Sequence, residues 1–274
     1  MKIAAVQMVS GASVERNLDA ARRLIAQAAR EGADLVALPE YFCLMGHHER
    51  DKLAVAEIAG AGPIQHMLGA AAREHGVWLI GGTLPIRTDD PERVFNASCV
   101  FAPDGSLAAR YDKIHLFRYL NGREDHDERR VLRAGALPVA FGAAVGSAAH
   151  RVGLSICYDL RFPELYRALM TPPCDLLAVP SAFTHGTGQA HWELLLRARA
   201  VENQCYVIAP AQGGRHENGR RTWGHSMVVD PWGEVLAVLP EGEGVVMAAL
   251  DPQRLVDVRE RLPALAHRRA LNAA

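Results

Sequence analysis

The segment Gly153-Leu154-Ser155-Ile156-Cys157-Tyr158-Asp159-Leu160-Arg161-Phe162-Pro163-Glu164 contains an abrupt change of pattern in this chain of 274 residues. Its first part completes an apolar run, Arg151–Cys157, that predicts a strand. Pro163 suits the first turn of a helix, which we expect over Phe162–Met170. Cys157 therefore lies at a sharp strand-to-helix junction, where converging backbone N–H groups suit both a thiolate and an oxyanion. The alternative is a buried cysteine at a strand end, and the local sequence favours neither.

Short apolar runs alternate with helical stretches on both sides of this segment. Helical spacing predicts helices at Val14–Glu31, which ends at Gly32, Ile64–His75, which ends at Gly76, Ala190–Glu202 and Pro252–Leu262. Further strands are predicted at Lys2–Met8, Asp34–Pro39, Val77–Gly81, Val94–Phe101, Leu107–Asp112, Leu176–Val179, Cys205–Ala211, Ser226–Val229, Val235–Val238 and Val245–Leu250. This order indicates an α/β protein with helices covering its sheets, and it leaves open whether there is one sheet or two.

Two polar stretches interrupt this alternation. Leu116–Ala136 is charged and lacks periodicity, so we interpret it as a long loop, and long ordered loops are often functional. Gly213–Arg221 is a polar, basic loop that we expect near a pocket or a subunit interface. No linker or low-complexity stretch divides the chain, so we expect residues 1–274 to form a single domain.

The composition excludes several classes of protein. Hydrophobic residues make up 49% and charged residues 22%, which argues against disorder and fibrous folds. The net charge of -1 gives no electrostatic footprint for nucleic acid or an anionic membrane. No apolar run is long enough for a membrane span, and the start lacks the pattern of a signal peptide. We therefore expect a cytoplasmic protein that binds neither nucleic acid nor membrane.

The chain has five cysteines with no CxxC pair, which argues against a zinc ribbon or a disulfide scaffold. Cys99 and Cys205 lie in predicted strands, and Cys174 lies in a turn without polar partners. Cys43 is the closest rival of Cys157 as a nucleophile, but its apolar neighbours are expected to raise its pKa. The twelve histidines show no metal-ligand spacing, so we predict no metal, and no nucleotide-binding motif or other cofactor signature is present.

Two further residues end predicted strands. Glu40 follows Leu35-Val36-Ala37-Leu38-Pro39, at the edge of a sheet where ligand sites form, and suits a general base. Lys113 closes Arg110-Tyr111-Asp112, and its cation suits an oxyanion. Taken singly, each has a structural interpretation: a solvated acid, and a salt bridge to Asp112. Together with Cys157 they supply a nucleophile, a base and an electrophilic stabiliser, which acyl transfer requires.

In three ordered segments the sequence resembles the nitrilase superfamily of carbon–nitrogen hydrolases. The segments are Leu38–Phe42, Tyr111–Phe117 and Gly153–Glu164, which carry the Glu–Lys–Cys triad of that family at Glu40, Lys113 and Cys157. The likeness continues to Gly224-His225-Ser226 and Asp230-Pro231-Trp232-Gly233. It implies a four-layer αββα sandwich, a homodimer or higher homo-oligomer formed through helical faces, and no cofactor.

The family pattern also has a second glutamate in the loop after the lysine. Glu128 matches it best, with Glu124, Asp125 and Asp127 as rivals, and its implied role is to orient Lys113 and the substrate. The implied mechanism has Glu40 deprotonating Cys157, attack on an amide carbon, an oxyanion held by Lys113 and the Tyr158 N–H, and a thioester intermediate that water hydrolyses.

Within the family, the chain is similar to amidases that act on deaminated glutathione, in stretches such as Pro180–Thr184 and Ala211–His216. The implied reaction is hydrolysis of a small carboxylate-bearing amide with release of ammonia. Arg161 is a candidate clamp for the substrate carboxylate, with a structural pair to Asp159 or Glu164 as an equal alternative. Thr184 is a candidate hydroxyl contact. An ω-amidase acting on α-ketoglutaramate, an N-carbamoyl amine hydrolase, a nitrilase proper and a non-enzymatic scaffold remain alternatives.

Overall fold

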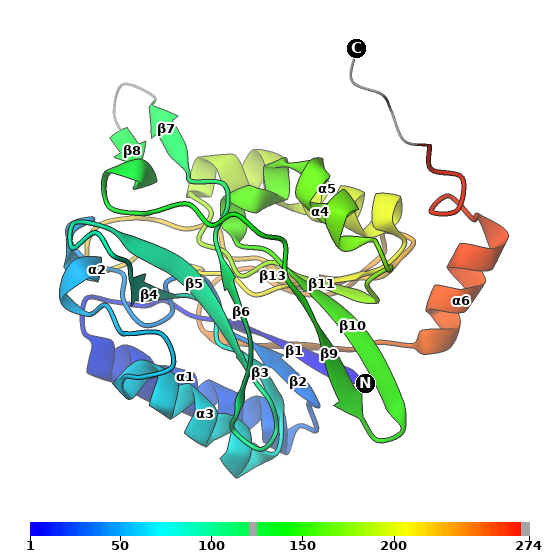
Figure 1. Ribbon diagram of the computed structural model, residues 1–274, viewed down its shortest axis with the longest axis horizontal. Coiled ribbons are helices and arrows are strands. Elements are labelled where there is room, and N and C mark those ends of the chain that lie inside the picture. The colour runs from blue at the N-terminus through cyan, green and yellow to red at the C-terminus, as the bar shows by residue number, and fades with distance from the viewer. Residues whose placement is uncertain (121–124, 270–274) are drawn as a thin grey trace.

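Two sheets lie face to face between two layers of helices in the computed structural model of this chain, which describes residues 1–120 and 125–269 (Figure 1). The first sheet has seven strands in the order β15 (Gly244–Ala249), β1 (Lys2–Gln7), β2 (Leu35–Ala37), β3 (Trp78–Ile80), β5 (Val94–Phe101) and β4 (Leu84–Arg87), with β6 (Leu107–Asp112) also paired to β5. The second has six in the order β14 (Val235–Leu239), β13 (Ser226–Val229), β12 (Tyr206–Ala209), β11 (Leu176–Ala178), β10 (Ala148–Leu154) and β9 (Ala140–Val145).

Helices α1 (Val14–Arg30) and α3 (Pro63–His75) cover the outer face of the first sheet. Helices α4 (Pro163–Leu169) and α5 (His185–Asn203) cover the outer face of the second (Figure 1). Two further helices, α2 (Asp51–Ala54) and α6 (Pro252–Arg261), lie at the edges. This arrangement confirms the four-layer αββα sandwich implied by the resemblance, and it answers the question of sheet number with two stacked sheets.

Helix boundaries follow local chemistry. Ser13 caps α1 by accepting a hydrogen bond from the Arg16 N–H at 3.3 Å. Pro63 begins α3, where its missing N–H costs nothing, and Gly76 ends it with a φ of +63°. The predicted boundaries of both helices are correct to within one residue.

Apolar packing holds the four layers together. One continuous core fills the space between the sheets, with fully buried residues such as Ile3, Leu35 and Val152, and it extends beneath α4, where Leu177 lies. A second core between the first sheet and its helices includes Leu24. Because central strands such as β2 and β11 are buried on both faces, they are apolar without alternation, as parallel strands of covered sheets usually are.

Several sequence-based expectations differ from the structure, which also contains strand β4 and helix α2 where none was predicted. Leu116–Ala136, predicted to be a loop, contains the small hairpin β7 (Arg118–Leu120) and β8 (Asp125–Asp127) followed by the 3-10 helix η1 (Glu128–Arg130). These three-residue elements are too short to produce a periodic pattern. Strand β10 ends at Leu154, before Cys157, and its partner β9 was missed because it is rich in Gly and Ala. Helix α5 begins at His185, five residues earlier than predicted, through a polar first turn.

Candidate active site

The ends of three strands bring the predicted catalytic residues together. Glu40 follows β2, Lys113 follows β6 of the same sheet, and Cys157 follows β10 of the opposite sheet. Glu40 and Lys113 are each 1% exposed and Cys157 is 8% exposed. All three line one cavity of about 350 Å³. The interface between the two sheets therefore holds a thiol, a carboxylate and an ammonium in one small space.

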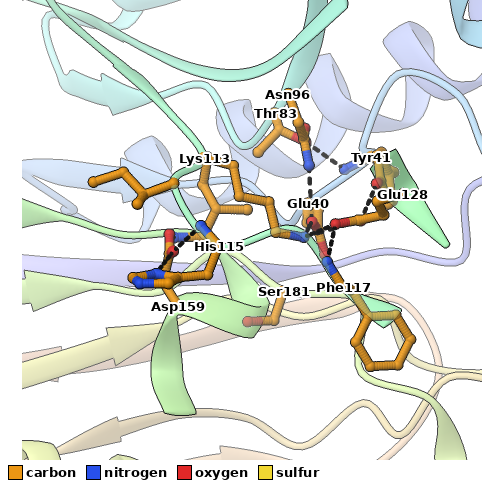
Figure 2. Close-up of polar contacts among 12 residues, drawn as sticks. Glu40, Tyr41, Thr83, Asn96, Lys113, His115, Phe117, Glu128, Asp159 and Ser181 are labelled. Carbon is orange, nitrogen blue, oxygen red and sulfur yellow. Dashed lines mark hydrogen bonds and ion pairs between the residues drawn. The ribbon is translucent and has the colours of Figure 1, made fainter. Parts of the chain in front are cut away.

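Lys113 lies between two carboxylates (Figure 2). Its Nζ is 2.9 Å from Oε1 of Glu40, and 3.0 and 2.9 Å from Oε1 and Oε2 of Glu128. Burial disfavours the charged form of the lysine, but the two carboxylates outweigh that effect and raise its pKa well above the usual value. Lys113 therefore stays protonated, and it makes no pair with Asp112, which binds Arg110 instead.

Cys157 occupies a strained turn. Its φ is +48°, in the left-handed region that costs a non-glycine residue about 1–2 kcal/mol, and its N–H donates to the carbonyl of Pro180 at 2.9 Å. It begins the 3-10 helix η2 (Cys157–Arg161), so the next N–H, that of Tyr158, lies in a first turn where N–H groups have no intrahelical acceptor. This N–H is thus available to an oxyanion beside the sulfur.

The thiol of Cys157 is neutral at rest. Burial raises its pKa well above the usual value, the negative charge of Glu40 and a hydrogen bond to it raise it further, and Lys113 lowers it. Lys113 lowers the pKa of the thiol, but it does not outweigh burial and Glu40. A nucleophilic role for this thiol therefore requires a base that removes its proton.

Glu128 is the loop acid that meets Lys113. Its Oε1 accepts a hydrogen bond from the Tyr41 hydroxyl at 2.6 Å, and its Oε2 accepts one from the Phe117 N–H at 2.7 Å (Figure 2). Asp127, a rival, binds Arg129 at 2.6 Å. The second rival, Asp125, lies in β8, and the third, Glu124, lies outside the described residues. The contacts of Glu128 keep its carboxylate fixed against Lys113.

Asn96 is a residue of this site that the sequence analysis missed. It lies in β5, and its Nδ2 donates to Oε1 of Glu40 at 2.9 Å, while its carbonyl accepts the Lys113 N–H at 3.0 Å. The sequence could have pointed to Asn96, because it is an amide inside the apolar run Val94–Phe101 and a buried amide needs hydrogen-bond partners. Asn96 and Lys113 both occupy Oε1 of Glu40, so the other oxygen, Oε2, is the one left to accept a proton.

A buried carboxylate ties the lysine segment to the cysteine turn. Asp159 is fully buried and accepts hydrogen bonds from the Tyr111 hydroxyl at 2.7 Å and the Ile156 N–H at 2.9 Å. It also accepts the His115 N–H at 3.0 Å and lies 2.7 Å from Nδ1 of that ring (Figure 2). Tyr111 and His115 flank Lys113, so this network fixes the turn at Cys157 relative to Lys113.

The predicted substrate-binding residues line the same cavity. Tyr158, Arg161 and Thr184 lie on its wall together with further residues not predicted for it: Tyr41, Phe117, Ala182, Phe183, Thr187 and Arg220. Nη1 of Arg161 is 3.2 Å from Nδ1 of His191, and its guanidinium lies over the Phe183 ring at 5.4 Å. Across residues 1–120 and 125–269, Arg161 makes no ion pair with Asp159, Glu164 or another carboxylate, which leaves its charge available to an anion.

The other four cysteines are buried and lie outside the catalytic cavity. Cys174, expected to lack polar partners, accepts a hydrogen bond from Nη1 of Arg151 at 3.3 Å. Burial raises the pKa of Cys43 to about 12, that of Cys99 to about 12 and that of Cys174 to about 11. Burial also raises the pKa of Cys205 well above the usual value. Cys157 differs from them because it adjoins both a carboxylate and an ammonium. Within the described part of the chain, no cluster of His, Cys, Asp or Glu could hold a metal ion.

Comparisons with known proteins agree with this geometry. Residues 2–260 match the pattern of the family described as Carbon-nitrogen hydrolase. Deaminated glutathione amidase of Synechocystis is 43% identical over 269 residues, which are 97% of each chain. Nit3 of Saccharomyces cerevisiae, a member of branch 10 of the nitrilase superfamily, superposes with a TM-score of 0.86 at 31% identity, over 96% of this chain and 94% of that one.

A longer relative contains a similar fold. The NitFhit protein of C. elegans superposes with a TM-score of 0.87 at 38% identity. The superposition covers 98% of this chain and 65% of the NitFhit chain, so this chain spans about two thirds of that protein. Separately, among residues 1–120 and 125–269 no helix has the length and apolar character that a membrane crossing requires.

Proposed function

Because this chain belongs to the carbon-nitrogen hydrolase family, we propose that it is an amidase in which Cys157 is the nucleophile, Glu40 the general base and Lys113 the oxyanion stabiliser. The observation that carries the proposal is that the Cys157 thiol shares one cavity with Glu40, whose carboxylate binds Lys113, which in turn binds Glu128. A nucleophile beside a base that is itself held by a third group has the arrangement of a catalytic triad.

In the proposed first half-reaction, Oε2 of Glu40 takes the proton from the thiol as the sulfur attacks the amide carbon. The carbonyl oxygen becomes an oxyanion that Lys113 and the Tyr158 N–H stabilise, and losing one such donor typically costs about 3–4 kcal/mol of transition-state stabilisation. The carbon–nitrogen bond then breaks, and Glu40 returns the proton to the leaving amine. The acyl group remains as a thioester on Cys157.

In the second half-reaction, a water molecule replaces the amine. Glu40 takes a proton from the water, the hydroxide attacks the thioester carbon, and the same two donors hold the second oxyanion. The carbon–sulfur bond breaks, and the sulfur regains its proton from Glu40. Glu128, with Asn96 on the other side, keeps Lys113 and Glu40 in register, so a single carboxylate serves both steps.

The proposed substrate is a small amide that carries a carboxylate, with deaminated glutathione as the specific candidate. Arg161 and Arg220 add two cations to the cavity wall, and Thr184 adds a hydroxyl. With deaminated glutathione as the substrate, ammonia is no longer the expected product. The amide nitrogen of a γ-glutamyl linkage belongs to the cysteine, so the leaving group is the amine of cysteinylglycine. Ammonia is released only from a primary amide such as α-ketoglutaramate.

We also propose that residues 1–274 form a single cytoplasmic domain that assembles as a homodimer or larger homo-oligomer, without nucleic-acid or membrane partners. Support for the assembly comes from exposed apolar side chains on and near α5 and β14: Leu194, Val201, Trp232, Leu236 and Val238. Exposed apolar side chains that gather on neighbouring elements are typical of protein–protein interfaces. Light scattering of the purified chain tests the assembly, and a monomer at micromolar concentration contradicts it.

A substrate panel tests the function. Deaminated glutathione, α-ketoglutaramate, an N-carbamoyl amine and a simple nitrile are incubated with the protein, and the released amine, ammonia and carbon dioxide are measured. We expect the highest kcat/KM with deaminated glutathione and none with Cys157→Ala. Preference for α-ketoglutaramate indicates an ω-amidase, and carbon dioxide release indicates a carbamoyl-amine hydrolase. Turnover of none of them leaves the non-enzymatic scaffold as the better interpretation.

A further inference from the structure

A second, outer cavity adjoins the catalytic one. It measures about 800 Å³, against about 350 Å³ for the catalytic cavity, and the two share Tyr41 and Arg220 in their walls. His47, His48 and His126 also line the outer cavity. A molecule that reaches Cys157 therefore has room on the far side of Tyr41 for a further segment, and basic side chains surround that room.

The guanidinium of Arg220 forms no ion pair or hydrogen bond within residues 1–120 and 125–269. Its charge interacts with Glu49, but Glu49 contacts Lys52 directly. In contrast, Lys52 in the same outer cavity forms a short ion pair with Glu49, and its Nζ lies 4.9 Å from the centre of the Tyr41 ring. Because Glu49 contacts Lys52 directly and not Arg220, the guanidinium of Arg220 keeps its hydrogen-bonding capacity for a ligand in this cavity.

The loop that carries Arg220 is fixed by buried contacts. Nδ1 of His216 lies 2.8 Å from the Ser10 carbonyl and its Nε2 lies 2.8 Å from the Thr222 hydroxyl. The His216 N–H donates to the Arg220 carbonyl at 2.9 Å, and Asn218 accepts the Arg220 N–H at 3.0 Å. Burial lowers the pKa of His216, so its ring is neutral, and its two contacts hold the loop in place. The backbone at Arg220 is therefore held in place before any ligand binds.

We propose that the outer cavity is a leaving-group subsite, in which Arg220 binds the terminal carboxylate of an extended amine whose amide carbon lies at Cys157. This inference rests on the proposed function and adds the substrate class to it. In this proposal the two arginines recognise different parts of the substrate. Arg161 lies in the catalytic cavity and binds the acyl half, and Arg220 lines both cavities and binds the leaving amine. A planar guanidinium suits a carboxylate because it can donate two parallel hydrogen bonds.

A comparison of two matched amides tests whether the protein recognises the terminal carboxylate of the leaving amine. Both carry the acyl group of deaminated glutathione. One has cysteinylglycine as the leaving amine, and the other has the same dipeptide with its terminal carboxylate converted to a carboxamide. We expect the wild-type protein to favour the carboxylate form in kcat/KM by about tenfold or more, the usual scale for a charge-assisted hydrogen bond.

Variants then assign the preference to one residue. We expect Arg220→Ala to reduce the carboxylate preference to less than about threefold and Arg220→Lys to keep part of it, because a lysine retains the charge without the fork. The matched control is Arg221→Ala. Arg221 is the next arginine, is exposed and lies 3.6 Å from Glu241, outside both cavities, so its removal is expected to leave the preference unchanged.

The outcomes are distinct. Equal turnover of the two amides by the wild-type protein overturns the leaving-group subsite and leaves the proposed function intact. An equal loss on both amides in Arg220→Ala, with the preference kept, also overturns it and assigns Arg220 to the acyl half or to folding. No turnover of either amide by the wild-type protein overturns the proposed function itself, and with it this inference.

Discussion

The cluster of Glu40, Lys113 and Glu128 and the arginines of the cavity wall use charge in opposite ways. In the cluster, the residues are at most 8% exposed, and both lysine-binding carboxylates carry further hydrogen bonds from Asn96, Tyr41 and Phe117. Arg161 and Arg220 are half-buried and meet no carboxylate in the described chain. The proposed function thus assigns the chemistry to side chains that already bind one another. It assigns substrate recognition to two arginines that have no carboxylate partner among the described residues.

Replacing Glu40 tests the cluster where the largest effect is expected. Glu40→Gln keeps the shape and removes the base, so we expect kcat to fall by about 10³-fold or more. The charge of Glu40 also raises the pKa of Cys157 while Lys113 lowers it. In this variant the pKa of Cys157 should therefore fall, and alkylation of Cys157 by iodoacetamide should reach its half-maximal rate at a lower pH. Mass spectrometry identifies the modified residue.

The control for that variant is Glu74→Gln, an exposed acid outside the catalytic cavity, which should match the wild-type protein in both assays. An unchanged or higher pKa for Cys157 in Glu40→Gln contradicts the electrostatic account of the resting thiol.

Removing the cation has the next largest effect. Lys113→Met fills a similar volume but leaves Glu40 and Glu128 buried without their shared partner. We expect kcat to fall by about 10²–10³-fold and the free energy of unfolding to fall by about 3–5 kcal/mol. Assays at a temperature where the variant is folded, with urea denaturation alongside, separate the two effects. Lys2→Met, at an exposed lysine, should change neither, and a fully stable Lys113→Met would refute the buried ion cluster.

Asp159 tests whether the lysine segment and the cysteine turn need a common anchor. Asp159→Asn keeps the size and weakens the acceptor for the Tyr111 hydroxyl, the Ile156 N–H and His115. As a positioning residue, it should lower kcat by about tenfold with little change in KM, and lower stability by about 1–3 kcal/mol. Asp19→Asn, at an exposed acid, is the control. A stability loss without any change in kcat would limit Asp159 to a structural role.

The smallest effect is expected on the cavity wall. Arg161→Ala removes one cation facing the acyl carboxylate, so KM should rise by about tenfold while kcat changes less, because the cation binds ground state and transition state alike. Arg22→Ala, at an exposed arginine on α1, controls for loss of net charge. If kcat falls and KM stays constant, Arg161 belongs with the catalytic cluster and the contrast drawn above is wrong.

The sequence predicted most strands and helices because their apolar patterns are local. Val94–Phe101 and Leu107–Asp112 have the predicted boundaries, since a clear Pro-Asp-Gly turn separates two apolar runs. The β7–β8 hairpin was missed because its strands are three residues long, too short to show a period. The ion pair that joins them, Arg118 with Asp127 at 3.9 Å, exists only once the strands are paired. Strand β9 gave no signal because alanine and glycine suit many conformations.

The site divides in the same way. The sequence alone determined which reactive groups the site contains. A cysteine, a glutamate and a lysine follow predicted strands, and the three segments that carry them resemble one family of carbon–nitrogen hydrolases. Tertiary structure decided which acid meets Lys113, that Asn96 and Asp159 hold the cluster, and that Arg220 joins two cavities. Such choices depend on contacts between residues that are often far apart in the chain, and no local pattern encodes a distance across two stacked sheets.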